Sequence, residues 1–178
     1  MKKLLLGIAA VCLAGFTFAQ DAPLWMRHSV ISPDGTTIAF TYKGDIYTVP
    51  VAGGRAMQIT TNPAYDTAPV WSPDSKRIAF ASDRMGSLDV YIVAKDGGEP
   101  RRLTTHSGSE TPLAFTDAGH VLFSAGIMPS AEAVVFPSNG QFNQVYRVSV
   151  EGGRPTMISS MPMECISINK EGAMLYQD

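Results

Sequence analysis

The 178-residue chain has 14 Lys and Arg against 16 Asp and Glu, which gives a formal net charge of −2. It has no basic cluster of the kind that binds a phosphate backbone, so nucleic acid is excluded as an expected partner. Its two cysteines are Cys12 and Cys165, and Cys12 lies in the amino-terminal apolar segment. We therefore expect no internal disulfide in the mature chain, and stability must come from packing.

The first nineteen residues, MKKLLLGIAAVCLAGFTFA, have the order of a secretory signal peptide. Lys2 and Lys3 precede an apolar run that ends in Thr17-Phe18-Ala19, which has the small-x-small form of a cleavage site. The run is short for a membrane-spanning helix, which needs about 20 apolar residues. An uncleaved anchor is the alternative. We predict a signal peptide over 1–19, cleavage before Gln20, export to the bacterial periplasm and no membrane contact after cleavage.

A phrase in the amino-terminal half recurs along the chain. VISPDGTTIAF, from Val30 to Phe40, returns as VWSPDSKRIAF, from Val70 to Phe80, and more weakly as LAFTDAGHVLF, from Leu113 to Phe123. A fourth copy begins in ISINKEGAMLY near the end of the sequence. The Pro-Asp pair predicts a turn, because proline presets φ and aspartate bonds the backbone just beyond it. Repetition of this kind is typical of stacked structural units.

A second phrase follows each of the first three copies. It reads GDIYTVPVAGGRAMQIT from Gly44, LDVYIVAKDGGEPRRLT from Leu88 and NQVYRVSVEGGRPTMIS from Asn143. The shared Gly-Gly pair predicts a tight hairpin, since such turns need positive φ. Each unit should therefore contain four strands. In the second unit the expected strands are Val70–Ser72, Arg77–Ala81, Asp89–Ala94 and Pro100–Thr104.

The predicted strands are nearly continuous in apolar character, which indicates sheets that are covered on both faces. We predict an all-β fold, a β-propeller of four-stranded antiparallel blades, with three blades plus the first hairpin of a fourth. The expected blades cover about 25–60, 66–104, 111–159 and 163–178. A β-sandwich is the alternative fold. Because propellers close with about four to eight blades, we expect 20–178 to be a fragment of a larger ring. A homo-oligomeric ring of identical chains is the alternative.

Two segments resemble known families. PVWSPDSKRIAFASDRMGSLDVYIVAKDGGEPRRLT, residues 69–104, closely resembles the TolB-type propeller repeat. APLWMRHSVISPDGTTIAFTYKGDIYTVPVAGG, residues 22–54, resembles the start of exported tricorn-like serine peptidases, in which propellers precede a PDZ domain and a catalytic domain. This resemblance implies that the chain is the propeller portion of such a peptidase. Its partners would then be peptides or unfolded protein substrates, which it filters or guides, and the downstream domains of the same chain.

Two other functions remain open at this point. One is a stand-alone, TolB-like periplasmic protein-binding propeller, and the other is the propeller of an α/β-hydrolase-type peptidase. A propeller fold alone does not distinguish between these functions.

No catalytic, cofactor-binding or metal-binding residue is predicted within residues 20–178, and no cofactor is expected. His28, His106 and His120 are expected on separate strands and loops, whereas a Ser-His-Asp site requires convergence. The sequence lacks G-x-S-x-G and H-E-x-x-H motifs. MPMEC, from Met161 to Cys165, has soft donors that suit Cu(I), but methionines that fill gaps in an apolar linker are the preferred interpretation.

Two loops are candidates for binding. SDRMGSLD, from Ser82 to Asp89, contains Asp83 and Arg84, for which a turn-stabilising ion pair is the preferred interpretation over substrate binding. SAGIMPSAEAVVFPSNGQFNQ, from Ser124 to Gln144, makes the third unit longer than the second. This insertion either binds a ligand through apolar residues such as Phe136, or is a tucked loop that covers a blade edge or packs against another domain.

Overall fold

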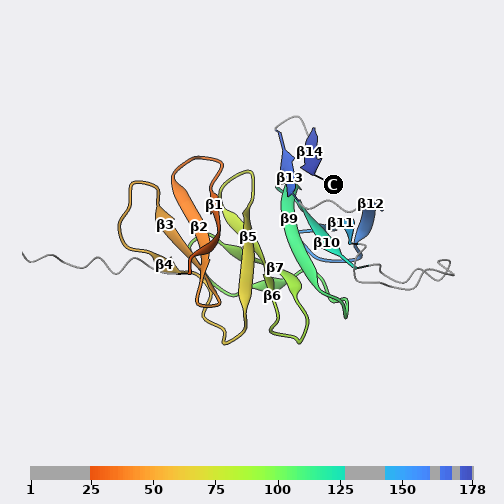
Figure 1. Ribbon diagram of the computed structural model, residues 1–178, viewed down its shortest axis with the longest axis horizontal. Coiled ribbons are helices and arrows are strands. Elements are labelled where there is room, and N and C mark those ends of the chain that lie inside the picture. The colour runs from red at the N-terminus through yellow and green to blue at the C-terminus, as the bar shows by residue number, and fades with distance from the viewer. Residues whose placement is uncertain (1–24, 127–142, 161–164, 170–172, 178) are drawn as a thin grey trace, which may run out of the picture.

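The structure is a computed structural model that describes residues 25–126, 143–160, 165–169 and 173–177 (Figure 1). Strands and turns make up these residues, with no helix among them. Within these ranges, therefore, no helix is long and apolar enough to cross a membrane. The predicted signal peptide, residues 127–142 of the insertion and residues 161–164 of the MPMEC segment lie outside the described residues.

The strands form three four-stranded antiparallel sheets and one two-stranded hairpin, and neighbours within each sheet follow chain order. This arrangement confirms the predicted β-propeller of four-stranded antiparallel blades. Blade 1 contains β1 Arg27–Ile31, β2 Thr37–Tyr42, β3 Asp45–Pro50 and β4 Met57–Gln58. Blade 2 contains β5 Asp66–Trp71, β6 Arg77–Ser82, β7 Asp89–Ala94 and β8 Arg101–Arg102. Blade 3 contains β9 Glu110–Asp117, β10 His120–Ala125, β11 Gln144–Ser149 and β12 Thr156–Ser159, and the hairpin contains β13 Cys165–Ile168 and β14 Met174–Gln177.

The Ser-Pro-Asp sequence closes the first hairpin of blade 2 through its side chains. The Ser72 hydroxyl donates to Asp74 Oδ1 at 2.5 Å and accepts from the backbone N–H of Arg77 at 2.9 Å. Asp74 Oδ1 also accepts from the N–H of Lys76 at 3.1 Å. The bond from Ser72 is the main cause that lowers the pKa of Asp74. The repeated phrase thus encodes a turn held together by its own polar groups.

The Gly-Gly pair forms the turn between β7 and β8, as predicted. Gly97 and Gly98 have φ values of 91° and 122°, in the region that favours glycine. The N–H of Gly97 donates to the carbonyl of Ala94 at 2.9 Å. The repeated glycines therefore have a backbone role in the hairpin.

Two strands of blade 2 differ from their expected bounds by more than one residue, and β6 extends one residue further, to Ser82. β5 begins at Asp66 instead of Val70, because its pairing with β6 continues across a bulge between Thr67 and Val70. β8 contains only Arg101–Arg102. It ends early because the Thr104 hydroxyl, in place of a backbone carbonyl, accepts the N–H of Val90 at 2.9 Å.

The hydrophobic core lies in the seams between blades. Seam 1–2, between blades 1 and 2, packs Ile46 and Ile59 against Ile78, Phe80 and Tyr91. An equivalent cluster fills seam 2–3, between blades 2 and 3. β6 is buried from Ile78 to Ser82, so residues on both faces of this strand are covered, as its continuous apolar character predicts.

The first strands of successive blades lie next to one another. β1 contacts β5, β5 contacts β9, and β9 contacts β13. Figure 1 shows β1, β5 and β9 in the middle of the molecule, with β13 above the upper end of β9. In a propeller the first strand of each blade is the innermost, so these strands form a wall of the central channel. We call the end where the chain enters each first strand the crossover end, and the opposite end, with the Pro-Asp turns, the hairpin end.

Candidate functional site

The wall formed by the first strands carries a groove with a volume of about 1030 Å³. Its lining comes from β1, β5, β9 and β13 and from the adjoining turns at the hairpin end. Apolar side chains on all four strands contribute to it: Val30, Ile31, Val70, Leu113, Ile166 and Ile168. Ile31 is 57% exposed. The groove therefore offers apolar surface that residues within the described ranges leave uncovered.

Trp71 holds two strands of this wall together. Its indole is buried, and Nε1 donates to the backbone carbonyl of Val30 at 3.2 Å. The bond satisfies a polar group on β1 from the neighbouring blade. The side chain thus gives the wall a fixed spacing between β1 and β5.

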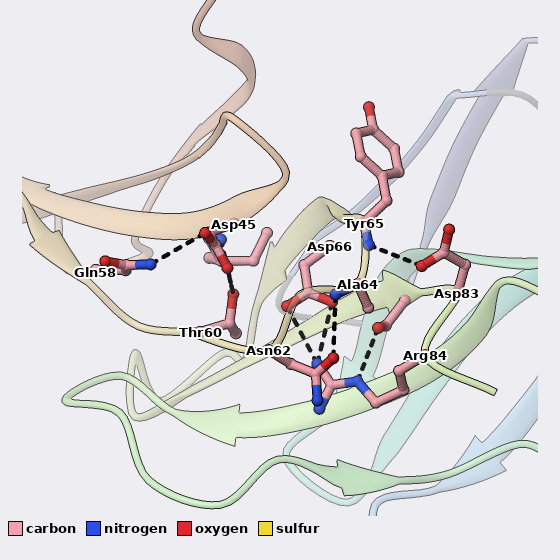
Figure 2. A network of polar contacts seen from close by, with 11 residues as sticks. Asp45, Gln58, Thr60, Asn62, Ala64, Tyr65, Asp66, Asp83 and Arg84 are labelled. Carbon is pink, nitrogen blue, oxygen red and sulfur yellow. Dashed lines mark hydrogen bonds and ion pairs between the residues drawn. The ribbon is translucent and has the colours of Figure 1, made fainter.

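A polar network occupies the crossover end of seam 1–2 (Figure 2). Asp66 is completely buried at the start of β5, and Arg84 Nη2 lies 3.1 Å from both of its carboxylate oxygens. Arg84 Nε donates to Ser82 Oγ at 2.8 Å, and the guanidinium lies 4.4 Å from the centroid of the Tyr91 ring. The Arg84 guanidinium makes these contacts within the protein, so its charge stabilises the fold.

The expected ion pair in the loop after β6 therefore has a different partner. Arg84 pairs with Asp66 instead of the adjacent Asp83, so an ion pair between Asp83 and Arg84 is the wrong assignment. Asp83 accepts the backbone N–H of Tyr65 at 2.7 Å (Figure 2). Because adjacent residues in this loop point to different elements, Arg84 reaches back to the preceding strand. Both charges stabilise the entry of the chain into blade 2.

Asp45 completes the network from blade 1. It accepts from Gln58 Nε2 at 3.0 Å and from the Thr60 hydroxyl at 3.4 Å (Figure 2). Burial, and then the negative charge of Asp66, raise the pKa of Asp45. The seam thus holds two carboxylates with one guanidinium.

Seam 2–3 has an equivalent cluster with different partners. Asp89 and Glu110 replace Asp45 and Asp66, and both are completely buried. Arg102 Nη2 lies 2.8 Å from Asp89 Oδ2. Burial, and then the charge of Asp89, raise the pKa of Glu110 to about 7 despite the nearby Thr104 hydroxyl.

Neither cluster was predicted from the sequence, although the repeat contains a signal for both. At the first two junctions between units, a threonine is followed six positions later by an acid: Thr60 precedes Asp66, and Thr104 precedes Glu110. The acid at the entry of blade 2 or blade 3 lies across the seam from the first residue of the third strand in the preceding blade. The two acids of each cluster come from different blades, so no single motif in the sequence contains both of them.

The three histidines considered as catalytic candidates lie in separate places. His28 Nδ1 is 3.1 Å from Thr67 Oγ1 at the crossover end. His106 Nδ1 accepts the N–H of Gly108, whereas His120 Nδ1 lies 3.0 Å from Asp117 Oδ1 at the exposed hairpin end. The structure therefore does not bring the histidines together. In the described part of the chain, no three His, Cys, Asp or Glu residues form a group that could hold a metal ion.

Four-stranded blades, hydrophobic seams and a wall of first strands define a β-propeller. The family model for the tricorn protease N-terminal β-propeller domain matches residues 23–178. The chain belongs to this family.

Similar proteins include peptidases of greater length. The chain is 35% identical over 102 residues to tricorn protease homolog 1 of Streptomyces coelicolor, a match that covers 57% of this chain and 9% of that protein. It is 30% identical over 129 residues to the uncharacterized peptidase YuxL of Bacillus subtilis, which covers 71% of this chain and 20% of that protein. The chain thus spans only a small part of these relatives.

Solved structures agree on the fold. The crystal structure of TolB from Acinetobacter baumannii matches with a TM-score of 0.65 and 19% sequence identity. The match covers 85% of this chain and 37% of that one. At this identity the likeness concerns the propeller architecture alone.

Proposed function

We propose that this chain is the non-catalytic propeller segment of a periplasmic, tricorn-like serine peptidase. In this role it guides peptides or unfolded proteins to a catalytic domain outside residues 20–178. Family membership supports the link to a peptidase, and both relatives described above carry that activity in their names. The order of residues 1–19, basic, apolar and then small, supports export.

The groove on the channel wall is the observation that carries the guiding role. Its volume of about 1030 Å³ suits a segment of peptide. Unfolded chains expose the apolar side chains that folded proteins bury, so partly exposed Ile31 and Leu113 favour contact with unfolded substrates. A groove with apolar walls and few charges would bind peptides of many different sequences. A propeller that guides varied substrates needs this low specificity.

The charged residues support a non-catalytic role. Asp66 and Arg84 neutralise each other in the seam. Asp117 lines the groove and pairs with His120, but among the described residues no serine hydroxyl bonds to this histidine. A nucleophile and its base must meet beside a site where substrate can bind. The described residues use these groups for structural contacts instead.

Narrowing the groove tests the guiding role in the intact enzyme. Thr116→Trp adds bulk to the groove lining, whereas Thr105→Trp adds the same bulk to an exposed loop. For Thr116→Trp we expect kcat/KM to fall several-fold for a long unstructured peptide and to stay unchanged for a short chromogenic peptide. Thr105→Trp should change neither value. Equal effects of Thr116→Trp on both substrates, or no effect on the long one, would contradict the guiding role.

A further inference from the structure

Two carboxyl groups from neighbouring blades meet at the crossover end of seam 2–3. Asp89 begins β7 and Glu110 begins β9, and both are completely buried. The backbone N–H of Glu110 donates to the carbonyl of Leu88 at 2.7 Å, which places Glu110 beside Asp89 across the seam. Two ionised carboxylates have acceptors only, so they cannot bond to each other unless one of them carries a proton.

One guanidinium among the described residues, that of Arg102, lies beside this pair, and it forms an ion pair with Asp89 but not with Glu110. Arg102 Nη2 lies 2.8 Å from Asp89 Oδ2, at ion-pair distance but without the angle of a hydrogen bond. Among the described residues, no hydrogen bond of good geometry reaches any carboxylate oxygen of Asp89 or Glu110. Arg102 Nε is also buried without a hydrogen-bond partner within the described ranges. Buried polar atoms without partners are costly, and a proton between the two carboxyl groups would give their oxygens a donor.

Two nearby side chains do not supply that donor. His106 Nδ1 lies 3.6 Å from Glu110 Oε1, but it accepts the N–H of Gly108 at 3.0 Å. This nitrogen therefore holds no proton and has none to give to Glu110. The Thr104 hydroxyl lies close enough to lower the pKa of Glu110, yet it forms no bond of good geometry with either oxygen.

Charged groups on the other strands packed against β9 are engaged elsewhere. Asp66 on β5 pairs with Arg84. Arg77 on β6 donates to the carbonyl of Ala118 at the hairpin end, and His120 on β10 pairs with Asp117 at that same end. Within the described ranges, no second cation faces Glu110.

In seam 1–2, Asp66 occupies the position equivalent to Glu110 and has a cation beside it. There Arg84 contacts both oxygens of Asp66. In the third unit the sequence has Ile127 at the position that corresponds to Arg84, counted along the paired second strands. The third unit thus has an apolar residue at the position where the second unit has the arginine that pairs with its entry acid. Glu110 therefore has no arginine from the equivalent position of its own unit.

We propose that Asp89 and Glu110 share one proton across seam 2–3, so that this seam is a proton-binding site that ties blade 3 to blade 2. The proton supplies this donor and removes one of two like charges. Burial favours the protonated form of Glu110 and raises its pKa from 4.5 to about 7. This inference does not depend on the proposed function.

The direction of the pH effect follows from this shift. Folded Glu110 holds its proton more tightly than unfolded Glu110, so the contribution of the proton to stability is fully present below pH 4.5. The seam then loses stability as the pH rises from about 4.5 to about 7, where the folded site releases its proton. Glu110→Gln should remove this dependence, because the amide is neutral at every pH and donates N–H groups.

Hydrogen exchange in the intact protein tests the proposal. We compare peptides from β7 and β9 in wild type and Glu110→Gln at about pH 5 and about pH 8, on either side of the predicted transition. The ratio of wild-type to variant exchange rates should rise about tenfold or more between these pH values, since one pKa unit is a tenfold change. The matched control is Glu99→Gln, at an exposed glutamate, and its ratio should stay constant. A constant ratio for Glu110→Gln would overturn the proposal.

A second measurement needs no variant to fold. In protein with ¹³C-labelled glutamate, one side-chain carboxyl of the wild type should titrate with an apparent pKa of about 7, as a property of the pair. If every glutamate carboxyl titrates near its ordinary value of about 4.3, the shared proton does not exist. If added Ca²⁺ slows exchange at β7 and β9 in wild type but not in Glu110→Gln, the site binds a metal cation, and the proposal is likewise overturned.

Discussion

Replacing Arg84 with alanine should destabilise seam 1–2 by about 3–5 kcal/mol, because it leaves Asp66 as an unpaired charge in the core. Asp66 is completely buried, and the Arg84 side chain is only 13% exposed. The variant also loses the contact of the guanidinium with the Tyr91 ring. Hydrogen exchange of peptides from β5 and β6 in the intact protein measures the loss locally.

Two comparison variants make this result specific. Lys95→Ala removes a cation whose pair with Asp96 is exposed, so exchange at the seam should not change. Asp66→Asn combined with Arg84→Met leaves no charge in the seam and should recover part of the stability lost by Arg84→Ala. If Arg84→Ala is no more damaging than Lys95→Ala, Arg84 does not neutralise Asp66 in the folded protein.

Phe80→Ala should cost about 3–5 kcal/mol, since it opens a cavity in the core of seam 1–2. The Phe80 ring is completely buried and stacks on Tyr91 with centroids 5.9 Å apart. At one factor of ten for every 1.36 kcal/mol, exchange of β6 and β7 peptides should accelerate by about two orders of magnitude or more. Met85→Ala is the control, because Met85 is 64% exposed. Equal exchange in the two variants would show that the seam is not the core.

The repeated phrases made the fold predictable because they encode local turns. Ser72 and Asp74 close a hairpin through contacts a few residues apart, and Gly97 and Gly98 supply positive φ at the next turn. All the residues that form each of these turns are close together in the sequence, so the turns can be predicted from local motifs. The stacking of blades then follows, because each blade must bury apolar residues such as Phe80 against a neighbour.

The polar seams were not predictable from local motifs because they join residues of different strands and blades. Arg84 follows Asp83 directly, yet its partner is Asp66, 18 positions away. The pairing depends on where the loop after β6 directs each side chain, and that direction is a tertiary property. β8 was predicted too long for a similar reason, since the Thr104 hydroxyl takes a donor that a backbone carbonyl would otherwise take.

Part of the functional prediction remains a proposal. The sequence of the Ser82–Asp89 loop allowed either binding or structure, and the observed contacts of Arg84 assign this residue to structure. Residues 127–142 of the insertion lie outside the described residues. The guiding role depends instead on the groove formed by the first strands.

The most direct test of a non-catalytic propeller in a serine peptidase is to locate the reactive serine. The intact protein is treated with a fluorophosphonate probe, which modifies activated serine nucleophiles, and the labelled serine is identified by mass spectrometry of its peptides. We predict one labelled serine outside residues 20–178, together with peptide hydrolysis that the probe abolishes. A labelled serine within residues 20–178, or hydrolysis that continues after complete labelling, would contradict this prediction.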